Sequence, residues 1–227
     1  MNPYYEDEWV TLYHGDCLQI TDWLAADVLV TDPPYGIDYS RGEWAKQRGK
    51  NNCSEGIAND TTTDARDAAL ALWGTRPALV FGSDRAPRPS GVKWPLIFEK
   101  PTVACGLVGR RGPWLSNWEF IFACGDWPDQ TPTNGSVYKT RALASSGYSG
   151  YATKAGHPHA KPLDVLEALI VTCPPGTIAD PFAGSGSTLV AAKALGRKAI
   201  GVELEERYCE IAARRLAQDV LDFGGAA

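Results

Sequence analysis

The stretch that most constrains the fold of this chain is residues 177 to 208, "TIADPFAGSGSTLVAAKALGRKAIGVELEERY". A short apolar run leads through Gly184-Ser185-Gly186 into a helical pattern, and a second apolar run follows and ends at Glu203. Glycines allow a tight turn and a close backbone approach, and a helix N-terminus offers unpaired N–H groups to the polar end of a ligand. This order of strand, turn, helix and strand is typical of a parallel α/β sheet.

The alternation of apolar runs and helical patterns recurs along the rest of the chain. Helical periodicity is clearest in "KPLDVLEALIVTC", "GSTLVAAKALG" and "LEERYCEIAARRLAQDVLDF". The apolar runs predict seven strands, over Val10–His14, Val28–Thr31, Ala78–Phe81, Leu96–Glu99, Phe120–Ala123, Thr177–Ala179 and Ala199–Val202. We therefore expect an α/β fold with a doubly wound, mostly parallel seven-stranded sheet.

Length and composition predict a single globular domain. A chain of 227 residues is most simply one domain, here residues 1–227, and 44% hydrophobic with 22% charged residues is an ordinary composition for such a domain. Two stretches, residues 40–60 and 126–160, look irregular and are interpreted as loop insertions. No apolar run approaches the roughly 20 residues that span a bilayer, and the N-terminus has no signal-peptide pattern, so we expect a cytoplasmic protein without a membrane partner.

Neither the cysteines nor the histidines form the pattern of a metal site. The six cysteines include no C-x-x-C pair, which argues against a zinc knuckle and a disulfide framework. His157 and His159 share a loop that has no carboxylate at ligand spacing. We therefore expect no metal, and most cysteines should be small buried hydrophobic residues.

The glycine turn also narrows the choice of cofactor. It reads G-S-G-S-T, which is neither the G-x-G-x-x-G of dinucleotide enzymes nor the G-x-x-x-x-G-K-[ST] that cradles triphosphates. No lysine directly follows the glycines, so ATP fits poorly. Glu203, at the end of the second strand, is well placed to accept both hydroxyls of a ribose. The pattern indicates a site for a nucleoside cofactor.

A second motif, "VTDPPYGIDY", follows the apolar run "DVLV". Proline fixes its own φ and restricts the residue before it, so the backbone of Asp32 and Pro33 is confined. Taken alone, the motif is equally compatible with a surface turn.

Five quoted segments resemble one enzyme family in residues and in order. "DPFAGSGST" followed by "GVELEERYCEIAARRL" resembles the cofactor half of the S-adenosylmethionine-dependent DNA amino-methyltransferases, and "TDPPYG" resembles their catalytic tetrapeptide. "LYHGDCLQIT" and "GHPHAKPLDVLEALI" are similar to two further family motifs. The tetrapeptide precedes the glycine turn, as in the β arrangement of adenine-N6 and cytosine-N4 enzymes. The resemblance implies a Rossmann-like methyltransferase sheet with a circularly permuted motif order.

The resemblance also implies a cofactor site for S-adenosylmethionine. Residues of the glycine turn would line the methionine side, Glu203 would hold the ribose hydroxyls, Asp16 and Cys17 would border the adenine ring, and Lys161 would approach the carboxylate end. Without the resemblance, Asp16 is a helix N-cap and Lys161 a solvated first-turn lysine. The implied set comprises Asp16, Cys17, Lys161, Asp180, Pro181, Phe182, Ala183, Gly184, Ser185, Gly186, Ser187 and Glu203.

The family's chemistry gives the tetrapeptide a purpose. An exocyclic amino group is a poor nucleophile because its lone pair is delocalised into the ring, so transfer needs acceptors that hold its N–H groups and aim the lone pair. The resemblance assigns the catalytic residues Asp32, Pro33, Pro34 and Tyr35. The Asp32 carboxylate and the Pro33 carbonyl would accept the two hydrogens, and Tyr35 would stack on a base flipped out of the duplex.

The activity that the resemblance implies is site-specific methylation of double-stranded DNA, as in restriction-modification systems. Aspartate rather than serine before Pro-Pro favours adenine N6 over cytosine N4, which stays open as the alternative. A third interpretation is a non-catalytic module that binds DNA and the cofactor. Dimers occur in this family, so a homodimer is also compatible with the resemblance.

Basic residues in the two insertions are candidate DNA contacts, and a solvated surface is the alternative interpretation of each set. The net charge of -5 argues against indiscriminate coating of nucleic acid but allows a local basic groove. Trp94, Lys100 and Glu119 fall in a region that the resemblance brings near the active site, without an assigned role. The candidates for DNA binding are Arg41, Lys46, Arg48, Lys50, Lys139 and Arg141.

Overall fold

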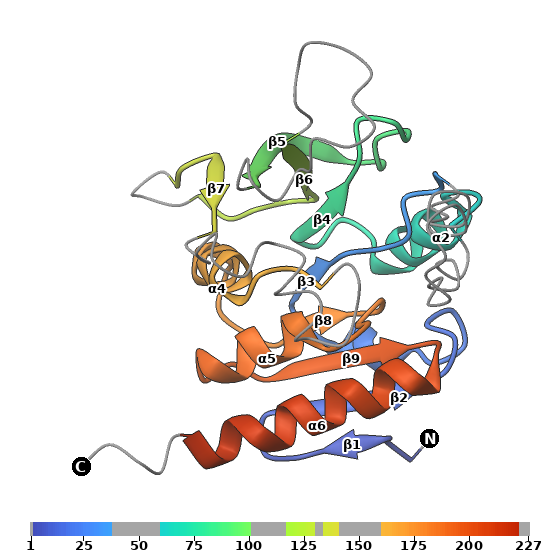
Figure 1. Ribbon diagram of the computed structural model, residues 1–227. Coiled ribbons are helices and arrows are strands. Elements are labelled where there is room, and N and C mark those ends of the chain that lie inside the picture. Colours follow the sequence, from blue (N-terminus) through green and yellow to red (C-terminus); the bar gives the residue numbers. More distant parts are fainter. Residues whose placement is uncertain (1, 38–59, 101–116, 130–133, 141–159, 223–227) are drawn as a thin grey trace, which may run out of the picture.

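The computed structural model describes residues 2–37, 60–100, 117–129, 134–140 and 160–222. The strands within these ranges are β1 (Tyr5–Glu6), β2 (Val10–His14), β3 (Val28–Thr31), β4 (Ala78–Gly82), β5 (Val92–Glu99), β6 (Trp118–Cys124), β7 (Val137–Lys139), β8 (Ile178–Asp180) and β9 (Ala199–Glu203). They form one sheet in the order β1-β2-β9-β8-β3-β4-β6-β5-β7 (Figure 1).

All seven predicted strands are present, but the described sheet has nine strands, so the predicted count was wrong. The two additional strands are β1 and β7, which have two and three residues and lie at the two edges. Segments this short show no hydrophobic period. β7 also corrects the interpretation of residues 126–160 as wholly irregular, because Val137 to Lys139 pair with Ile97 to Glu99 of β5.

The sheet is mostly parallel, as predicted. β2, β9, β8, β3 and β4 run parallel to one another, whereas β6 is antiparallel to both of its neighbours, β4 and β5. From β8 the chain crosses to β9 on one side, and from β3 it crosses to β4 on the other. The direction of winding therefore reverses between β3 and β8, which is where ligands bind in open α/β sheets.

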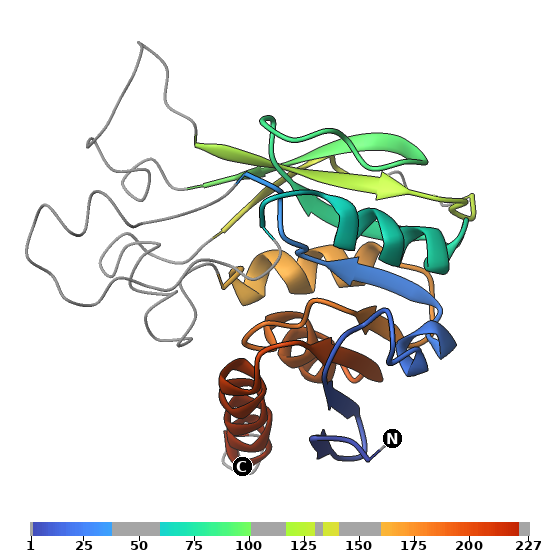
Figure 2. The ribbon, with the colours of Figure 1, turned by 90° about the vertical axis from the view of Figure 1, so that its right-hand side faces the viewer.

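Helices cover both faces of the sheet, so the fold is doubly wound (Figures 1 and 2). One face carries α4 (Leu163–Thr172), α5 (Ser187–Ala194) and α6 (Glu206–Asp222), and the other carries the short 3₁₀ helix η1 (Asp22–Ala25) and α2 (Asp64–Trp73). Alternate residues of β3 serve the two faces, because Val28 and Val30 pack with the first group and Leu29 with the second. Trp23 and Trp73 stack with ring centroids 5.8 Å apart and join η1 to α2.

The helix α5 explains why the glycine turn is fixed so firmly. Every residue from Ser187 to Lys193 is buried, since the helix packs on the sheet with α4 on one side and α6 on the other. A helix that is apolar on most sides is stable only in such a central position. The segment before it is therefore anchored to the core.

Among the described residues, no helix combines the length and the apolar character that crossing a membrane requires.

Candidate functional site

The candidate site lies where the parallel strands end. Asp32 directly follows β3, the glycine turn follows β8, Glu203 ends β9, and Asp16 lies just beyond β2. Parallel strands place these ends at one edge of the sheet, and β3 and β8 are neighbours there. The two strand ends are also joined by a side-chain bond, because Thr31 Oγ1 donates to Asp180 Oδ1 at 2.7 Å. The tetrapeptide and the glycine turn thus become neighbours although about 150 positions separate them in the chain.

The glycine turn has the conformation that its sequence predicts. Gly184 and Gly186 have φ of 52° and 77°, a left-handed conformation that favours glycine, and Gly186 is the N-cap of α5. A Cβ added at Gly186 would lie 2.8 Å from Ala212 Cβ, so the turn also packs directly against α6. No room is left for a larger residue at this position.

Arg215 of α6 fixes the turn from outside. Its Nη1 donates to the Ser185 carbonyl oxygen at 2.6 Å and lies 3.1 Å from the hydroxyls of both Ser185 and Ser187. This contact was not predicted from the sequence, because an arginine in an amphipathic helix carries no signal that identifies its partner. Arg215 leaves the N-terminus of α5 preorganised.

Glu203 is buried and keeps acceptor capacity. Its Oε2 accepts the Gly184 N–H at 2.7 Å, and its Oε1 accepts the Glu205 N–H at 2.8 Å. An acid at the end of this strand is well placed to accept the hydroxyls of a ribose. Burial raises the pKa of Glu203, although the backbone N–H groups of Glu205, Gly184 and Leu204 act in the opposite direction. The carboxylate acceptor at this turn fits the ribose of a nucleoside.

Asp180 is a buried acid at the end of β8. It accepts hydrogen bonds from Thr31 Oγ1 and, at 3.1 Å, from the Phe182 N–H. Burial raises the pKa of Asp180 to about 7, against the hydrogen bonds that favour its charged form. These partners belong to the protein itself, so Asp180 organises the strand end. Its predicted contact with the methionine side of the cofactor stays a prediction.

The raised pKa of Asp180 predicts a pH dependence of folding. Between its ordinary value of 3.8 and about 7, the folded protein binds a proton that the unfolded chain has lost. The contribution of Asp180 to the free energy of unfolding therefore falls as pH rises through this window, by a few kcal/mol. Asp180→Asn should abolish this component. Urea unfolding of both proteins across the window checks it; a difference between them that does not change with pH would contradict it.

Asp32 is held by two partners, one on each oxygen. Tyr35 donates its hydroxyl to Asp32 Oδ1 at 2.8 Å, and Lys161 Nζ donates to Oδ2 at 2.7 Å. Lys161 Nζ also lies 3.2 Å from the Tyr35 hydroxyl. Burial and the nearby charge of Asp32 raise the pKa of Tyr35 well above its usual range, so this hydroxyl remains a donor. The carboxylate is thus fixed in direction before any substrate arrives.

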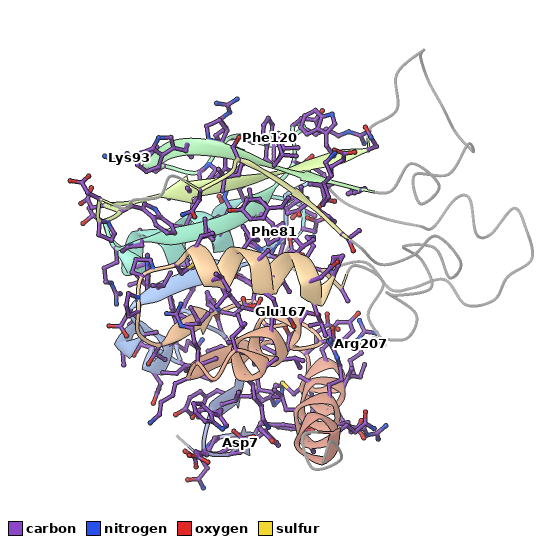
Figure 3. All side chains as sticks on the ribbon, turned by 90° about the vertical axis from the view of Figure 1, so that its left-hand side faces the viewer. Asp7, Phe81, Lys93, Phe120, Glu167 and Arg207 are labelled. Carbon is purple, nitrogen blue, oxygen red and sulfur yellow. The ribbon has the colours of Figure 1, made fainter. Side chains whose placement is uncertain are left out.

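Lys161 is buried, so its interpretation as a solvated first-turn lysine is wrong. The side chain is 6% exposed and precedes α4, which begins at Leu163. Its ammonium lies 5.0 Å from the centroid of the Phe81 ring, and Figure 3 shows Phe81 between its strand β4 and α4. The structure brings Lys161 to the tetrapeptide; its predicted approach to the carboxylate end of the cofactor stays a prediction.

A buried acid supports the turn after the tetrapeptide. Asp60 Oδ1 accepts the Gly36 N–H at 2.9 Å, and the Asp60 side chain is 4% exposed. Gly36 has φ of 72°, and a Cβ there would lie 2.7 Å from the carbonyl carbon of Thr62. Asp60 belongs to the predicted insertion of residues 40–60, and no role was predicted for it, because a single acid in a polar stretch is no distinctive signal.

Asp16 and Cys17 lie beside Glu203. The Gly15 N–H donates to the Glu203 carbonyl oxygen at 2.8 Å. Asp16 Oδ1 accepts the Leu18 N–H at 2.9 Å, which is the local bond expected of a capping or turn aspartate. Cys17 is buried, and burial raises the pKa of its thiol to about 12. Its thiol stays neutral and suits the edge of an apolar ring; contact of either residue with adenine stays a prediction.

Most candidate DNA contacts lie outside the described residues, as do His157 and His159. Lys139 ends the edge strand β7, is exposed, and pairs with Glu99 at 2.8 Å. In the part of the chain that the structure describes, no group of three or more histidine, cysteine, aspartate or glutamate residues could hold a metal ion. The candidates outside the description are Arg41, Lys46, Arg48, Lys50 and Arg141.

Comparisons with known proteins agree on one family. The family model described as DNA methylase, which covers N6 and N4 enzymes, matches residues 71–214, more than half of the chain. The Type II methyltransferase M2.LlaDCHI of Lactococcus lactis subsp. cremoris is 50% identical over 259 residues, which cover 94% of this chain and 91% of that protein.

Solved structures show the same fold. The M1.HpyAVI–SAM complex superposes with a TM-score of 0.60 at 22% identity and covers 91% of this chain and 98% of its own. The PvuII DNA methyltransferase, described as cytosine-N4-specific, superposes with a TM-score of 0.62 at 16% identity and covers 94% of this chain and 88% of its own.

Proposed function

We propose that this chain, which belongs to the DNA methylase family, transfers a methyl group from S-adenosylmethionine to the exocyclic N6 of adenine in DNA. The proposal rests on the aspartate that precedes Pro-Pro and on its position in the structure. Asp32 lies at the reversal point of the sheet, beside the glycine turn, with both carboxylate oxygens oriented by Tyr35 and Lys161.

The residues at the glycine turn fit the cofactor. The carboxylate of Glu203 suits the ribose hydroxyls as a hydrogen-bond acceptor, and the N-terminus of α5, held by Arg215, presents polar backbone to the methionine end. When bound, S-adenosylmethionine supplies an electrophilic methyl group on a sulfonium. We propose that the cofactor site is completed by the other residues predicted from the sequence. These are Asp180, Pro181, Phe182, Ala183, Gly184, Ser185, Gly186, Ser187, Asp16, Cys17 and Lys161.

Asp32 and Pro33 prepare the target nitrogen. In this proposal, the carboxylate and the carbonyl each accept one N–H of the amino group, which localises the lone pair and aims it at the methyl carbon. The bound cofactor would supply the methyl group for the new N–C bond, and its sulfur would keep the electron pair of the broken C–S bond. The nitrogen becomes positively charged and then releases a proton. In this proposal the Asp32 carboxylate, which already accepts one of the N–H groups, receives that proton.

Tyr35 and Pro34 complete the arrangement around the base. A ring that precedes a fixed turn can stack on a flipped base, which is the usual way for an enzyme to hold a base outside the duplex. The hydroxyl of Tyr35 points to Asp32, so one side chain couples the stacking surface to the acid. Asp60 would keep this turn in place while the base enters.

Identification of the methylated nucleoside tests the proposal. The protein is incubated with DNA and methyl-labelled S-adenosylmethionine, the DNA is digested, and the labelled nucleoside is identified by mass spectrometry. N6-methyl-2′-deoxyadenosine is the expected product. Label on cytosine N4 would replace adenine by the alternative substrate. Binding of DNA and cofactor without transfer would favour a non-catalytic module.

Target recognition and assembly are further parts of the proposal. We propose that residues 40–60 and 126–160 contact DNA through Arg41, Lys46, Arg48, Lys50, Lys139 and Arg141. Phosphate contacts of this kind should weaken with salt, so DNA affinity measured from low to high salt tests them as a group. Sedimentation with and without DNA tests a homodimer.

A further inference from the structure

Four charged side chains of alternating sign form a row that ends at Asp32. Lys161 Nζ lies 2.7 Å from Asp32 Oδ2 and 3.4 Å from Glu119 Oε2, so its ammonium is shared between two carboxylates. Lys100 forms an ion pair with the other oxygen of Glu119. Asp32 follows β3, Glu119 lies in β6, and Lys100 follows β5. The row therefore links the catalytic turn to the antiparallel part of the sheet.

The inner members of this row are well shielded from water. The side chain of Lys161 is 6% exposed and that of Glu119 is 16% exposed. In such surroundings an uncompensated charge is expensive, and paired charges interact strongly. Burial disfavours the ionised form of Glu119, but Lys161 and Lys100 outweigh this effect and lower its pKa. Glu119 is therefore an anion.

The surroundings of Glu119 Oε2 indicate an electrostatic interaction with Lys161. In the described structure this oxygen is buried and has no hydrogen-bond partner within bonding geometry, and the ammonium of Lys161 lies 3.4 Å from it. A buried carboxylate oxygen left in this state is unfavourable unless its charge acts on a neighbour. The neighbour on which it can act is the residue that orients Asp32.

We propose that Glu119 is a positioning residue for methyl transfer and acts on Asp32 through Lys161. This inference rests on the proposed function and adds two effects to it. Glu119 holds the ammonium in line with Asp32 Oδ2, which keeps the carboxylate turned toward the target amino group. It also balances charge, because the four groups Asp32, Lys161, Glu119 and Lys100 sum to a formal charge of zero.

The balance of charge matters because the target nitrogen becomes positive during transfer. A lysine next to Asp32 would oppose this change if its charge stood alone. The carboxylate of Glu119, which shares the ammonium with Asp32, offsets this repulsion. Lys161 can therefore orient Asp32 without weakening the electrostatic support that the transfer needs.

The test is a double-mutant cycle on Glu119 and Lys161. Glu119→Gln should lower kcat about tenfold, with KM for DNA and for the cofactor changed less than about threefold, because Glu119 touches neither. Lys161→Met should lower kcat roughly 100-fold. In the Lys161→Met background, Glu119→Gln should have no further effect, since its target is gone. Glu210→Gln, which removes an exposed ion pair with Arg214 on α6, is the matched control and should leave kcat unchanged.

A purely structural role for Glu119 predicts a different result. In that case Glu119→Gln would lower kcat by the same factor with and without Lys161, and would also lower the melting temperature. This result would overturn the inference. Glu119→Asp and Glu119→Asn, which differ only in charge, extend the test if Glu119→Gln does not fold. The aspartate variant should be the more active, and equal activities would also overturn it. A parent protein that transfers no methyl group would instead overturn the proposed function.

Discussion

Asp32→Asn is expected to lower kcat for methyl transfer by roughly 10²- to 10³-fold, the loss typical of removing one preorganised electrostatic group. Asparagine has nearly the same shape, but its amide has no charge and only one acceptor oxygen. It cannot satisfy both Lys161 and Tyr35 and still hold an amino hydrogen. Single-turnover methylation of DNA measures the loss of the chemical step directly.

The matched control for Asp32→Asn is Asp84→Asn. Asp84 follows β4, the parallel neighbour of β3, but its side chain is exposed. We expect parent activity from it, and cofactor affinity within about threefold of the parent value in both variants. Asp32→Asn with near-parent kcat would remove the aspartate from the mechanism. A parallel loss of cofactor affinity would mean that the substitution has disturbed the glycine turn.

Gly186→Ala is expected to weaken cofactor binding by about 100-fold and to destabilise the fold. The residue has φ of 77°, which costs an alanine roughly 1–2 kcal/mol. In addition, the new Cβ would lie 2.8 Å from Ala212 Cβ, so α5 and α6 must separate or the turn must shift. Such overpacking typically costs a further 1–3 kcal/mol, roughly. Calorimetric titration with S-adenosylmethionine and thermal unfolding measure the two effects.

Gly196→Ala separates strain from crowding, because the same helix offers both situations. Gly196 follows the other end of α5, has φ of 66°, and has nothing within 4 Å of the position where a Cβ would stand. It should show the backbone cost alone and bind the cofactor like the parent. Equal losses of cofactor affinity in the two variants would show that contact between the turn and α6 is irrelevant to binding.

The sequence by itself determined the framework. Each of the seven predicted strands is present, with β2 and β3 at the predicted bounds, because buried strands and amphipathic helices carry their periods in neighbouring residues. The short edge strands β1 and β7 were missed, since they are defined by backbone pairing with distant partners. The glycine turn and the tetrapeptide could be recognised in the sequence for the same local reason, because fixed backbone geometry requires glycine and proline at set positions.

The tertiary structure decided which side chains meet at the site. Nothing in the local pattern around Lys161, Glu119, Asp60 or Arg215 reveals their partners, which lie between 24 and 129 positions away or on another element. Such contacts depend on strand order, and the order places β3 beside β8 and β6 beside β4. The residues of the tetrapeptide were fixed by sequence, whereas the charges that orient Asp32 were assembled by the sheet, because electrostatic interactions follow distance in space and not along the chain.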